Sequence, residues 1–228
     1  MIAATKKNEL DVRTLSIARL ADDADQKTTT YKLARTSIHD GDLLAFRGTG
    51  LIPRHGRSQY SHVGTAAWRR ADQSTLLIAE SREQHGGRLV TLSSQVRAYP
   101  GLIDVYRPTH QCPEGVRQRA ATIAVNWSGY AYSYPGVLRM TLLHYPLARL
   151  IAEAWNGKRY DPTDTTLSTW HEPKVCSQLH AWAYRLAAIE LKIACDWDCC
   201  PNLGDRWIEP ADLARSGSYR LLYRGLAI

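Results

Sequence analysis

The sequence predicts an α+β protein in which short strands come first and helices follow. Between residues 42 and 106, short apolar runs alternate with turn residues, as expected for strands with short connections. Between residues 114 and 194, apolar residues recur at helical spacing instead. A last apolar run at 219–223 returns to the strand pattern. This order is typical of an α+β domain with a small antiparallel or mixed sheet, or a barrel, packed against helices.

The expected strands are short and are bounded by turn residues. His39, Asp40 and Gly41 form a turn signal before the first of them. Residues 49–58 contain glycine, proline and three basic side chains, a composition typical of a loop. The strands are expected at Asp42–Phe46, His62–Trp68, Ser74–Ala79 with Glu80 at its end, Arg88–Leu92, Leu102–Tyr106 and Tyr219–Tyr223.

Three longer segments have the spacing of helices. Glu114–Val125 ends before a Ser-Gly pair. Val137–Trp155 contains Pro146, which should kink or split it. Cys176–Ala194 has the most continuous apolar face and therefore the clearest helical pattern.

The composition is that of an ordinary globular chain. Of its 228 residues, 44% are apolar and 22% are charged, which allows a real core and excludes a disordered protein or a collagen. We interpret residues 1–37, which are polar and charged, as an N-terminal appendage and residues 38–228 as the main domain. Neither a secretory signal nor an apolar run of membrane-spanning length is visible, so the expected location is the cytoplasm, unless the protein is phage-borne or exported by a dedicated route.

The net charge indicates which kinds of partner the protein could bind, and the cysteine count indicates whether its thiols are reduced. A net charge of +7 weakly favours anionic partners such as an anionic polymer or a lipid surface. No run of five basic residues occurs, so no specific nucleic-acid partner is predicted. An odd number of unevenly spaced cysteines, without a secretory signal, favours reduced thiols over a disulfide scaffold. The cysteines are Cys112, Cys176, Cys195, Cys199 and Cys200.

Cys176 is the strongest candidate for a reactive residue. It lies at the expected N-terminus of a helix, where free amide groups and the helix dipole stabilise a thiolate. A nucleophilic thiolate also needs a base and a group that orients the base, and His62 and Glu80 could supply them from neighbouring strands. The alternative is that Cys176 is a small buried apolar residue, as many free cysteines are.

The order of several short motifs resembles the circularly permuted papain-like cysteine hydrolases, the NlpC-type proteins of the YiiX/YaeF-like branch. In this family the histidine and acid strands precede the cysteine helix. The resemblance covers about residues 38–225 and implies a permuted papain-like fold with the cysteine at the N-terminus of a helix. The matching motifs are Gly41-Asp42-Leu43-Leu44, Ser61-His62-Val63-Gly64, Glu80, Val175-Cys176-Ser177-Gln178-Leu179 and Pro210-Ala211-Asp212-Leu213.

The resemblance also implies roles for individual residues. Cys176 would be the nucleophile, His62 the general base and acid, and Glu80 the residue that orients the imidazole. Ser61, Ser177 and His180 are candidates for contacts with the substrate or the oxyanion. Gly64 matches the frame around the histidine, and Gly41 and Asp42 match a structural turn. Tyr132 or Tyr134 could correspond to a tyrosine of the family, and both stay outside the core site.

The implied function is that of a cysteine hydrolase, an amidase or peptidase, which cleaves an amide or isopeptide through a thioester intermediate without a cofactor. A peptidoglycan-derived peptide is the family-level expectation for the substrate, and other peptides, amides and esters stay open. One alternative is a lipid-directed acyltransferase or thioesterase of the same fold, although the sequence shows no hydrophobic anchor. The other is a catalytically silent basic binding module.

Two further interpretations compete for the same residues. His171, Cys176 and His180, with the later cysteines, have an arithmetically possible zinc spacing, but no tight Cys-x2-Cys pair is present. No metal is therefore predicted. Glu83, close to His85, could replace Glu80 as the acid, although a strand-end Glu80 fits the pattern better.

Overall fold

The structure of the chain is a computed structural model. The sequence before Thr29 and several shorter segments lie outside the part that it describes, including most of the expected loop at 49–58. The described residues are 29–48, 58–71, 74–143, 145–157, 159, 161–164, 166–193, 197–201 and 203–227.

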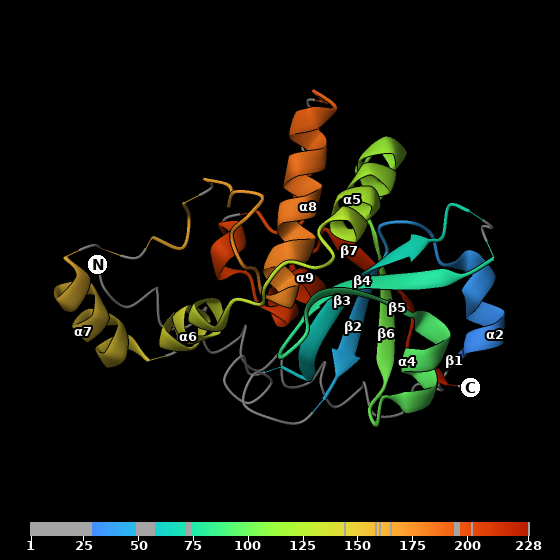
Figure 1. Ribbon diagram of the computed structural model, residues 1–228, viewed down its shortest axis with the longest axis horizontal. Coiled ribbons are helices and arrows are strands. Elements are labelled where there is room, and N and C mark those ends of the chain that lie inside the picture. The colour runs from blue at the N-terminus through green and yellow to red at the C-terminus, as the bar shows by residue number, and fades with distance from the viewer. Residues whose placement is uncertain are drawn as a thin grey trace, which may run out of the picture.

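A six-stranded antiparallel sheet organises the described residues (Figure 1). Its strand order is β5-β4-β3-β2-β6-β7, so the first five strands in the chain are neighbours and the last strand returns to the edge beside β6. The strands are β2 (Leu43–Arg47), β3 (Tyr60–Trp68), β4 (Leu76–Arg82), β5 (Gly86–Thr91), β6 (Ile103–Pro108) and β7 (Tyr219–Tyr223).

The longer helices lie between β6 and β7, as the sequence predicts, whereas two short helices lie before β2 and between β5 and β6. The α+β class is confirmed. Within the described part of the chain, no helix combines the length and apolarity needed to cross a bilayer. The helices are α2 (Tyr31–Ala34), α4 (Leu92–Ala98), α5 (Glu114–Asn126), α6 (Tyr134–Leu143), α7 (Pro146–Asn156), α8 (Cys176–Glu190) and α9 (Pro210–Arg215).

Both faces of the sheet are buried, because alternate side chains of each strand belong to different apolar clusters. On β2, Leu43 and Ala45 pack toward α5 and α8, whereas Leu44 and Phe46 pack against a second cluster that includes Leu92 of α4. Figure 1 shows α5 and α8 together, with α2 and α4 in a separate part of the molecule. Burial on both faces explains why the strand sequences are continuously apolar.

The end of the expected N-terminal appendage packs against the sheet domain. Thr29–Thr30 forms β1, which pairs in parallel with β8 (Leu226–Ala227) near the C-terminus. Ala34 and Ile38 are fully buried in the second cluster. Residues 1–28 of the appendage lie outside the described residues.

Several boundaries differ from those expected. Glu80 lies within β4, which continues to Arg82, and not at the end of the strand. The sequence analysis expects no helix at 92–98, where the structure has α4; Thr91 caps this helix by accepting a hydrogen bond from the Ser94 amide. Helix α8 ends at Glu190 instead of residue 194, and Lys192 just beyond has a left-handed backbone (φ 50°).

The predicted break at Pro146 is confirmed. The segment forms two helices, and Pro146 occupies the first turn of α7, where its missing N–H costs nothing. Gly157 ends α7 with a left-handed conformation (φ 59°), the usual conformation at a helix C-terminus.

Candidate active site

Cys176 is the first residue of α8, as the sequence predicts. Val175 precedes the helix in an extended conformation and provides no side-chain cap. The backbone N–H groups of Val63 and Ser177 instead point toward the Cys176 sulfur. The Cys176 side chain is almost fully buried, at 5% exposure. The sulfur therefore lies where the unpaired amides of a helix start favour a negative charge.

The segment before Cys176 is fixed to the sheet by its backbone. The Lys174 carbonyl accepts a hydrogen bond from Ser81 Oγ of β4 at 2.6 Å and one from the Ser133 amide at 3.3 Å. The Lys174 ammonium group donates to the carbonyl of Thr169 at 2.7 Å and lies 4.1 Å from the centre of the Trp182 ring. These contacts hold the start of α8 against β4.

His62 and Glu80 lie on neighbouring antiparallel strands, β3 and β4, and their side chains meet. Nε2 of His62 is 2.6 Å from Oε2 of Glu80. Gly64 of β3 lies against β4 beside this pair: a Cβ at Gly64 would come within 2.3 Å of Ile78 Cγ2 and 3.5 Å of Glu80 Cβ. A side chain at this position would therefore push the two strands' side chains apart, which gives Gly64 a physical reason in the motif.

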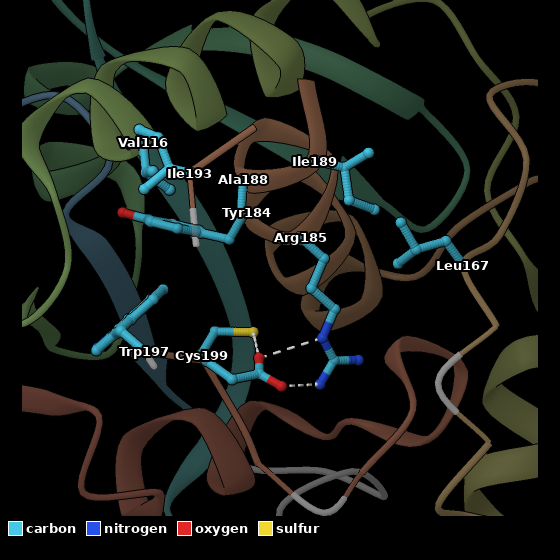
Figure 2. Close-up of a pocket in the computed structure, with 10 residues that line it drawn as sticks. Val116, Leu167, Tyr184, Arg185, Ala188, Ile189, Ile193, Trp197 and Cys199 are labelled. Atoms are coloured by element: carbon cyan, nitrogen blue, oxygen red, sulfur yellow. Dashed lines mark hydrogen bonds and ion pairs between the residues drawn. The ribbon is translucent and has the colours of Figure 1, made fainter. Parts of the chain in front are cut away.

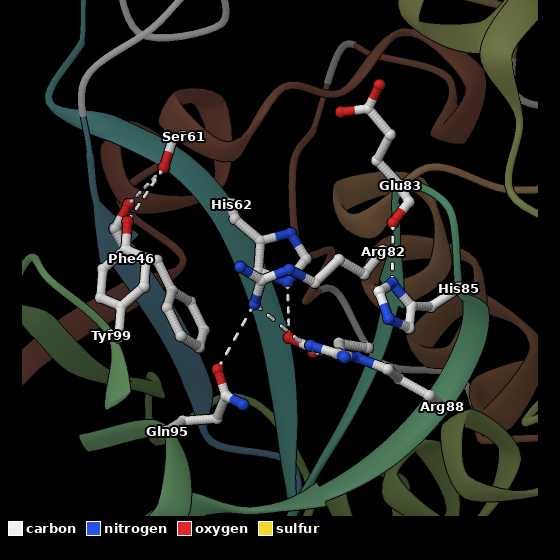
Figure 3. A network of polar contacts seen from close by, with 10 residues as sticks. Phe46, Ser61, His62, Arg82, Glu83, His85, Arg88, Gln95 and Tyr99 are labelled. Atoms are coloured by element: carbon white, nitrogen blue, oxygen red, sulfur yellow. Dashed lines mark hydrogen bonds and ion pairs between the residues drawn. The ribbon is translucent and has the colours of Figure 1, made fainter. Parts of the chain in front are cut away.

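Glu80 is held by two arginines as well as by His62. The Arg88 Nε and Nη2 groups lie 2.7 and 2.6 Å from Oε1, and Arg82 Nη1 lies 3.9 Å from the same oxygen. Figure 3 shows the side chains of Arg82 and Arg88 close to the His62 ring. Burial alone would raise the pKa of Glu80, but His62 and Arg88 outweigh it and lower that pKa to about 2.

The His62 ring also interacts with Cys176. Since Glu80 occupies Nε2, the nitrogen left for the hydrogen bond to the sulfur is Nδ1. Burial disfavours the protonated ring, but the charge of the Cys176 thiolate and the two hydrogen bonds outweigh it and raise the pKa of His62 to about 9. Burial likewise disfavours the thiolate, yet His62 and the two backbone amides lower the pKa of Cys176. The pair therefore favours a thiolate and an imidazolium.

The other described thiols differ from Cys176. Cys112, Cys199 and Cys200 are buried and form no disulfide within the described part of the chain, and Cys195 lies outside it. Burial raises the pKa of Cys199 well above its ordinary value and raises that of Cys200 to about 12. Both pack in the core beside α8.

The three tentative contact residues have structural partners. His180 is buried in the core, not on the surface or in a groove: Nδ1 lies 2.8 Å from Thr65 Oγ1 and Nε2 lies 2.8 Å from the Tyr219 hydroxyl. Ser177 Oγ donates to the Ile208 carbonyl at 2.5 Å. Ser61 Oγ lies 3.4 Å from the carbonyl of Phe46 and is half-buried.

Glu83, the alternative to Glu80, lies outside the candidate site, whereas Tyr132 lies close to Cys176. Glu83 is exposed, and its backbone carbonyl lies 3.0 Å from Nδ1 of His85 (Figure 3). Tyr132 is close enough to Cys176 for the thiolate, together with burial, to raise the pKa of the phenol. Tyr134 is 53% exposed, and its hydroxyl accepts from the Gln84 amide at 3.2 Å. The structure thus separates two tyrosines that the sequence left equivalent.

A pocket of about 300 Å³ lies elsewhere, along the C-terminal half of α8 (Figure 2). Its wall includes Tyr184, Trp197 and the ion pair of Arg185 with Asp198, at 2.8 Å. Arg185 also donates to the Leu203 carbonyl at 2.7 Å, so it fixes the loop after α8. The lining of this pocket does not include Cys176, and the pocket is separate from the candidate site.

Comparison with known proteins gives one informative result. No protein-family model matches the chain, and no curated protein matches it. Among solved structures, the crystal structure of the metalloprotein yiiX from Escherichia coli O157:H7 is similar, with a TM-score of 0.52 and 12% sequence identity. The similarity covers 82% of this chain and 98% of that chain. At this identity the match shows a YiiX-like fold.

The description of that neighbour as a metalloprotein raises the question of a metal at Cys176. In the described residues no group of three or more His, Cys, Asp or Glu side chains is arranged to hold a metal ion. Nε2 of His62 faces Glu80, and the second oxygen of that carboxylate faces Arg88. His180, the second histidine of the possible zinc spacing, is engaged on both ring nitrogens. The residues present here do not fit a metal centre.

Proposed function

We propose that the chain is a cysteine hydrolase, an amidase or peptidase, of the circularly permuted papain-like type related to the NlpC proteins. The observation that supports this most strongly is the position of the His62 ring, which contacts Cys176 on one side and Glu80 on the other. A nucleophile, a base and a group that orients the base are the minimum set for covalent acyl transfer. The YiiX-like fold is consistent with this assignment.

In the first half of the reaction, the Cys176 thiolate attacks the carbonyl carbon of an amide or ester. The new carbon–sulfur bond forms as the carbonyl electrons move to oxygen, which gives a tetrahedral oxyanion. When this intermediate collapses, the bond to the leaving amine or alcohol breaks, and protonated His62 donates its Nδ1 proton to that group. The products are a thioester on Cys176 and a neutral His62.

In the second half, neutral His62 takes a proton from water as the water oxygen attacks the thioester carbonyl. The carbon–sulfur bond then breaks, the acid leaves, and the thiolate and imidazolium pair is restored. Glu80 keeps its charge throughout and stabilises the imidazolium through Nε2, while Arg88 fixes the carboxylate.

Two donors would stabilise the oxyanion. The backbone N–H of Cys176 is at the N-terminus of α8 and can point at a charge that develops beside the sulfur. Tyr132 is the residue that we assign as the second donor, because its phenol is close to Cys176 and keeps its proton at neutral pH. The side chains of Ser177 and His180 are not needed for this role, since both have internal partners.

Trapping of the acyl-enzyme tests the proposal. A panel of p-nitrophenyl esters and peptide amides, including peptidoglycan-derived peptides, would be incubated with the protein, and the intact mass and peptide map would be recorded. We expect an acyl adduct on Cys176 and hydrolysis that is abolished in Cys176→Ala. Cys112→Ala is the matched control, because it removes another buried thiol and should leave hydrolysis unchanged. Hydrolysis that persists in Cys176→Ala would refute the assignment.

A further inference from the structure

Helix α7 presents an apolar stripe to solvent. Leu147, Leu150, Ile151 and Trp155 are 72%, 61%, 59% and 88% exposed. Their spacing places them on one face of the helix, together with the exposed Ala154. Scattered exposed apolar residues are ordinary on protein surfaces, but a continuous stripe on one helix is typical of a contact surface.

The polar side of the same helix is turned inward. Arg149 and Glu153 form an ion pair at 2.8 Å across one turn, and the Glu153 side chain is only 14% exposed. Ala148 and Ala152 on this side are also partly buried. An amphipathic helix of a globular protein normally has the opposite orientation, with its apolar side in the core. The orientation of α7 is therefore suited to an apolar environment outside the fold.

The neighbouring helix adds to this surface. We define the α6–α7 arm as residues 134–156, and Figure 1 shows α7 at the end of this arm, far from the sheet. On α6, Tyr134 and Leu138 are 53% and 62% exposed, and Tyr145 between the helices is 46% exposed. Tyrosine and tryptophan combine an apolar ring with a polar group, as side chains at a membrane interface commonly do.

The charges of the arm and of the whole chain indicate the kind of partner. From the start of the arm to residue 160, the chain has four basic residues and one acidic residue, and the whole chain has a net charge of +7. An apolar helix face flanked by arginine and lysine is the composition of helices that lie on anionic lipid bilayers. The basic residues are Arg139, Arg149, Lys158 and Arg159, and the acidic residue is Glu153.

We propose that the α6–α7 arm docks on an anionic lipid bilayer. In this arrangement Leu147, Leu150, Ile151 and Trp155 enter the boundary between the headgroups and the acyl chains, and the net positive charge of the arm and of the chain attracts the anionic headgroups. The helix lies in the plane of the interface and does not cross the membrane. The docking is independent of the proposed hydrolase activity.

The arm begins next to the candidate active site, which gives the docking a functional consequence. Gly136 in the first turn of α6 approaches Val175 closely, since a Cβ at Gly136 would lie 3.2 Å from Val175 Cγ1. Val175 directly precedes Cys176. A bilayer bound to the arm would therefore bring the proposed hydrolase to a membrane surface, where acyl groups and amides of lipid-attached molecules are concentrated.

Vesicle co-sedimentation of the full-length chain tests the proposal. We expect the protein to sediment with vesicles of phosphatidylcholine and phosphatidylglycerol more than with vesicles of phosphatidylcholine alone. The double variant Leu150→Asp/Ile151→Asp should bind the mixed vesicles at least about tenfold more weakly, because two charges would enter the apolar boundary. The matched control is Leu33→Asp/Ile189→Asp, which changes residues of 74% and 62% exposure on α2 and α8 and should bind like the wild type.

Trp155 provides a second measurement that does not depend on a charged substitution. Its emission should shift to shorter wavelength with the mixed vesicles, and Trp155→Phe should lose most of that shift. Cys176→Ala should bind vesicles like the wild type, which separates docking from catalysis. The proposal is overturned if the wild type does not sediment, if Leu150→Asp/Ile151→Asp binds normally, or if ultracentrifugation shows that the stripe instead joins two copies of the chain.

Discussion

Glu80 and His62 form a buried contact of 2.6 Å between Oε2 and Nε2, and this contact determines which ring nitrogen faces Cys176. Arg88 occupies the other oxygen of Glu80, so the carboxylate cannot turn away without leaving a guanidinium without its partner. The tautomer and the orientation of the His62 ring are therefore set by two neighbouring strands of the sheet. Cys176, the proposed nucleophile, comes from a helix that follows almost a hundred residues later.

Replacement of Glu80 by glutamine should lower the pKa of His62. The neutral amide removes the charge that stabilises the imidazolium, so His62 should lose its proton well below pH 9. An NMR titration of the imidazole resonances would measure this pKa directly. Glu83→Gln is the matched control, because Glu83 is exposed and should leave the titration unchanged. If Glu83→Gln lowered the pKa of His62 and Glu80→Gln did not, Glu83 would be identified as the acid.

Glu80 should also make the protein more stable above about pH 4.5 than below it. Its folded pKa of about 2 lies below the ordinary value of 4.5, so the ionised form stabilises the fold. This contribution is complete above pH 4.5 and disappears as the pH falls toward 2. Urea unfolding of the wild type and Glu80→Gln should show a free-energy difference that shrinks over this range. A difference that is constant with pH would contradict the assignment of the low pKa.

His180 should affect stability without affecting the chemistry at Cys176. In His180→Phe the hydroxyls of Thr65 and Tyr219 lose their partner, which should cost about 2 to 4 kcal/mol of unfolding free energy. Burial lowers the pKa of His180 to about 3. The wild type should therefore lose stability as the pH falls from 6.5 toward 3, and His180→Phe should lack this pH-dependent loss. His85→Phe, at an exposed position, is the control.

The alkylation rate of Cys176 should be nearly equal in His180→Phe and in the wild type. If the unfolding free energy and the alkylation rate of Cys176 are both measured on His180→Phe, the result distinguishes a core histidine from one that contacts the substrate. A His180→Phe protein that is fully stable but slow to react would restore the tentative assignment of this residue to the site.

Tyr132 and Tyr134 should differ in their effect on turnover. Removal of the Tyr132 hydroxyl takes away one oxyanion donor, so Tyr132→Phe should lower ester turnover by about tenfold to a hundredfold. The alkylation rate of Cys176 should stay the same, because alkylation forms no oxyanion. Tyr134→Phe removes a hydroxyl that contacts the Gln84 amide and should leave turnover unchanged. Equal effects of the two variants would contradict the proposed role of Tyr132.

The elements that depend on local patterns could be predicted from the sequence. The strands that contain His62 and Glu80, the helix that begins at Cys176 and the break at Pro146 follow from apolar spacing and from proline. The contact of Glu80 with His62 follows from their position on neighbouring strands, and the two side chains meet at 2.6 Å.

Other features depend on contacts between distant segments and could not be predicted. The carbonyl of Lys174 is fixed by Ser81 and Ser133, which lie many residues earlier in the chain. The burial of His180 depends on Thr65 and Tyr219 from two different strands. The amphipathic pattern of α7 is visible in the sequence, but the direction of its apolar side is set by how the arm leaves the domain.

The most direct test of the account is site-resolved alkylation of the native protein with iodoacetamide across a range of pH. Because His62 and two backbone amides lower the pKa of Cys176, this thiol should react fastest of the four described cysteines, with an apparent pKa below the free value of about 8.5. His62→Ala should remove this advantage. A Cys176 that reacts no faster than Cys112, Cys199 and Cys200, or that is indifferent to His62→Ala, would contradict the proposed catalytic pair.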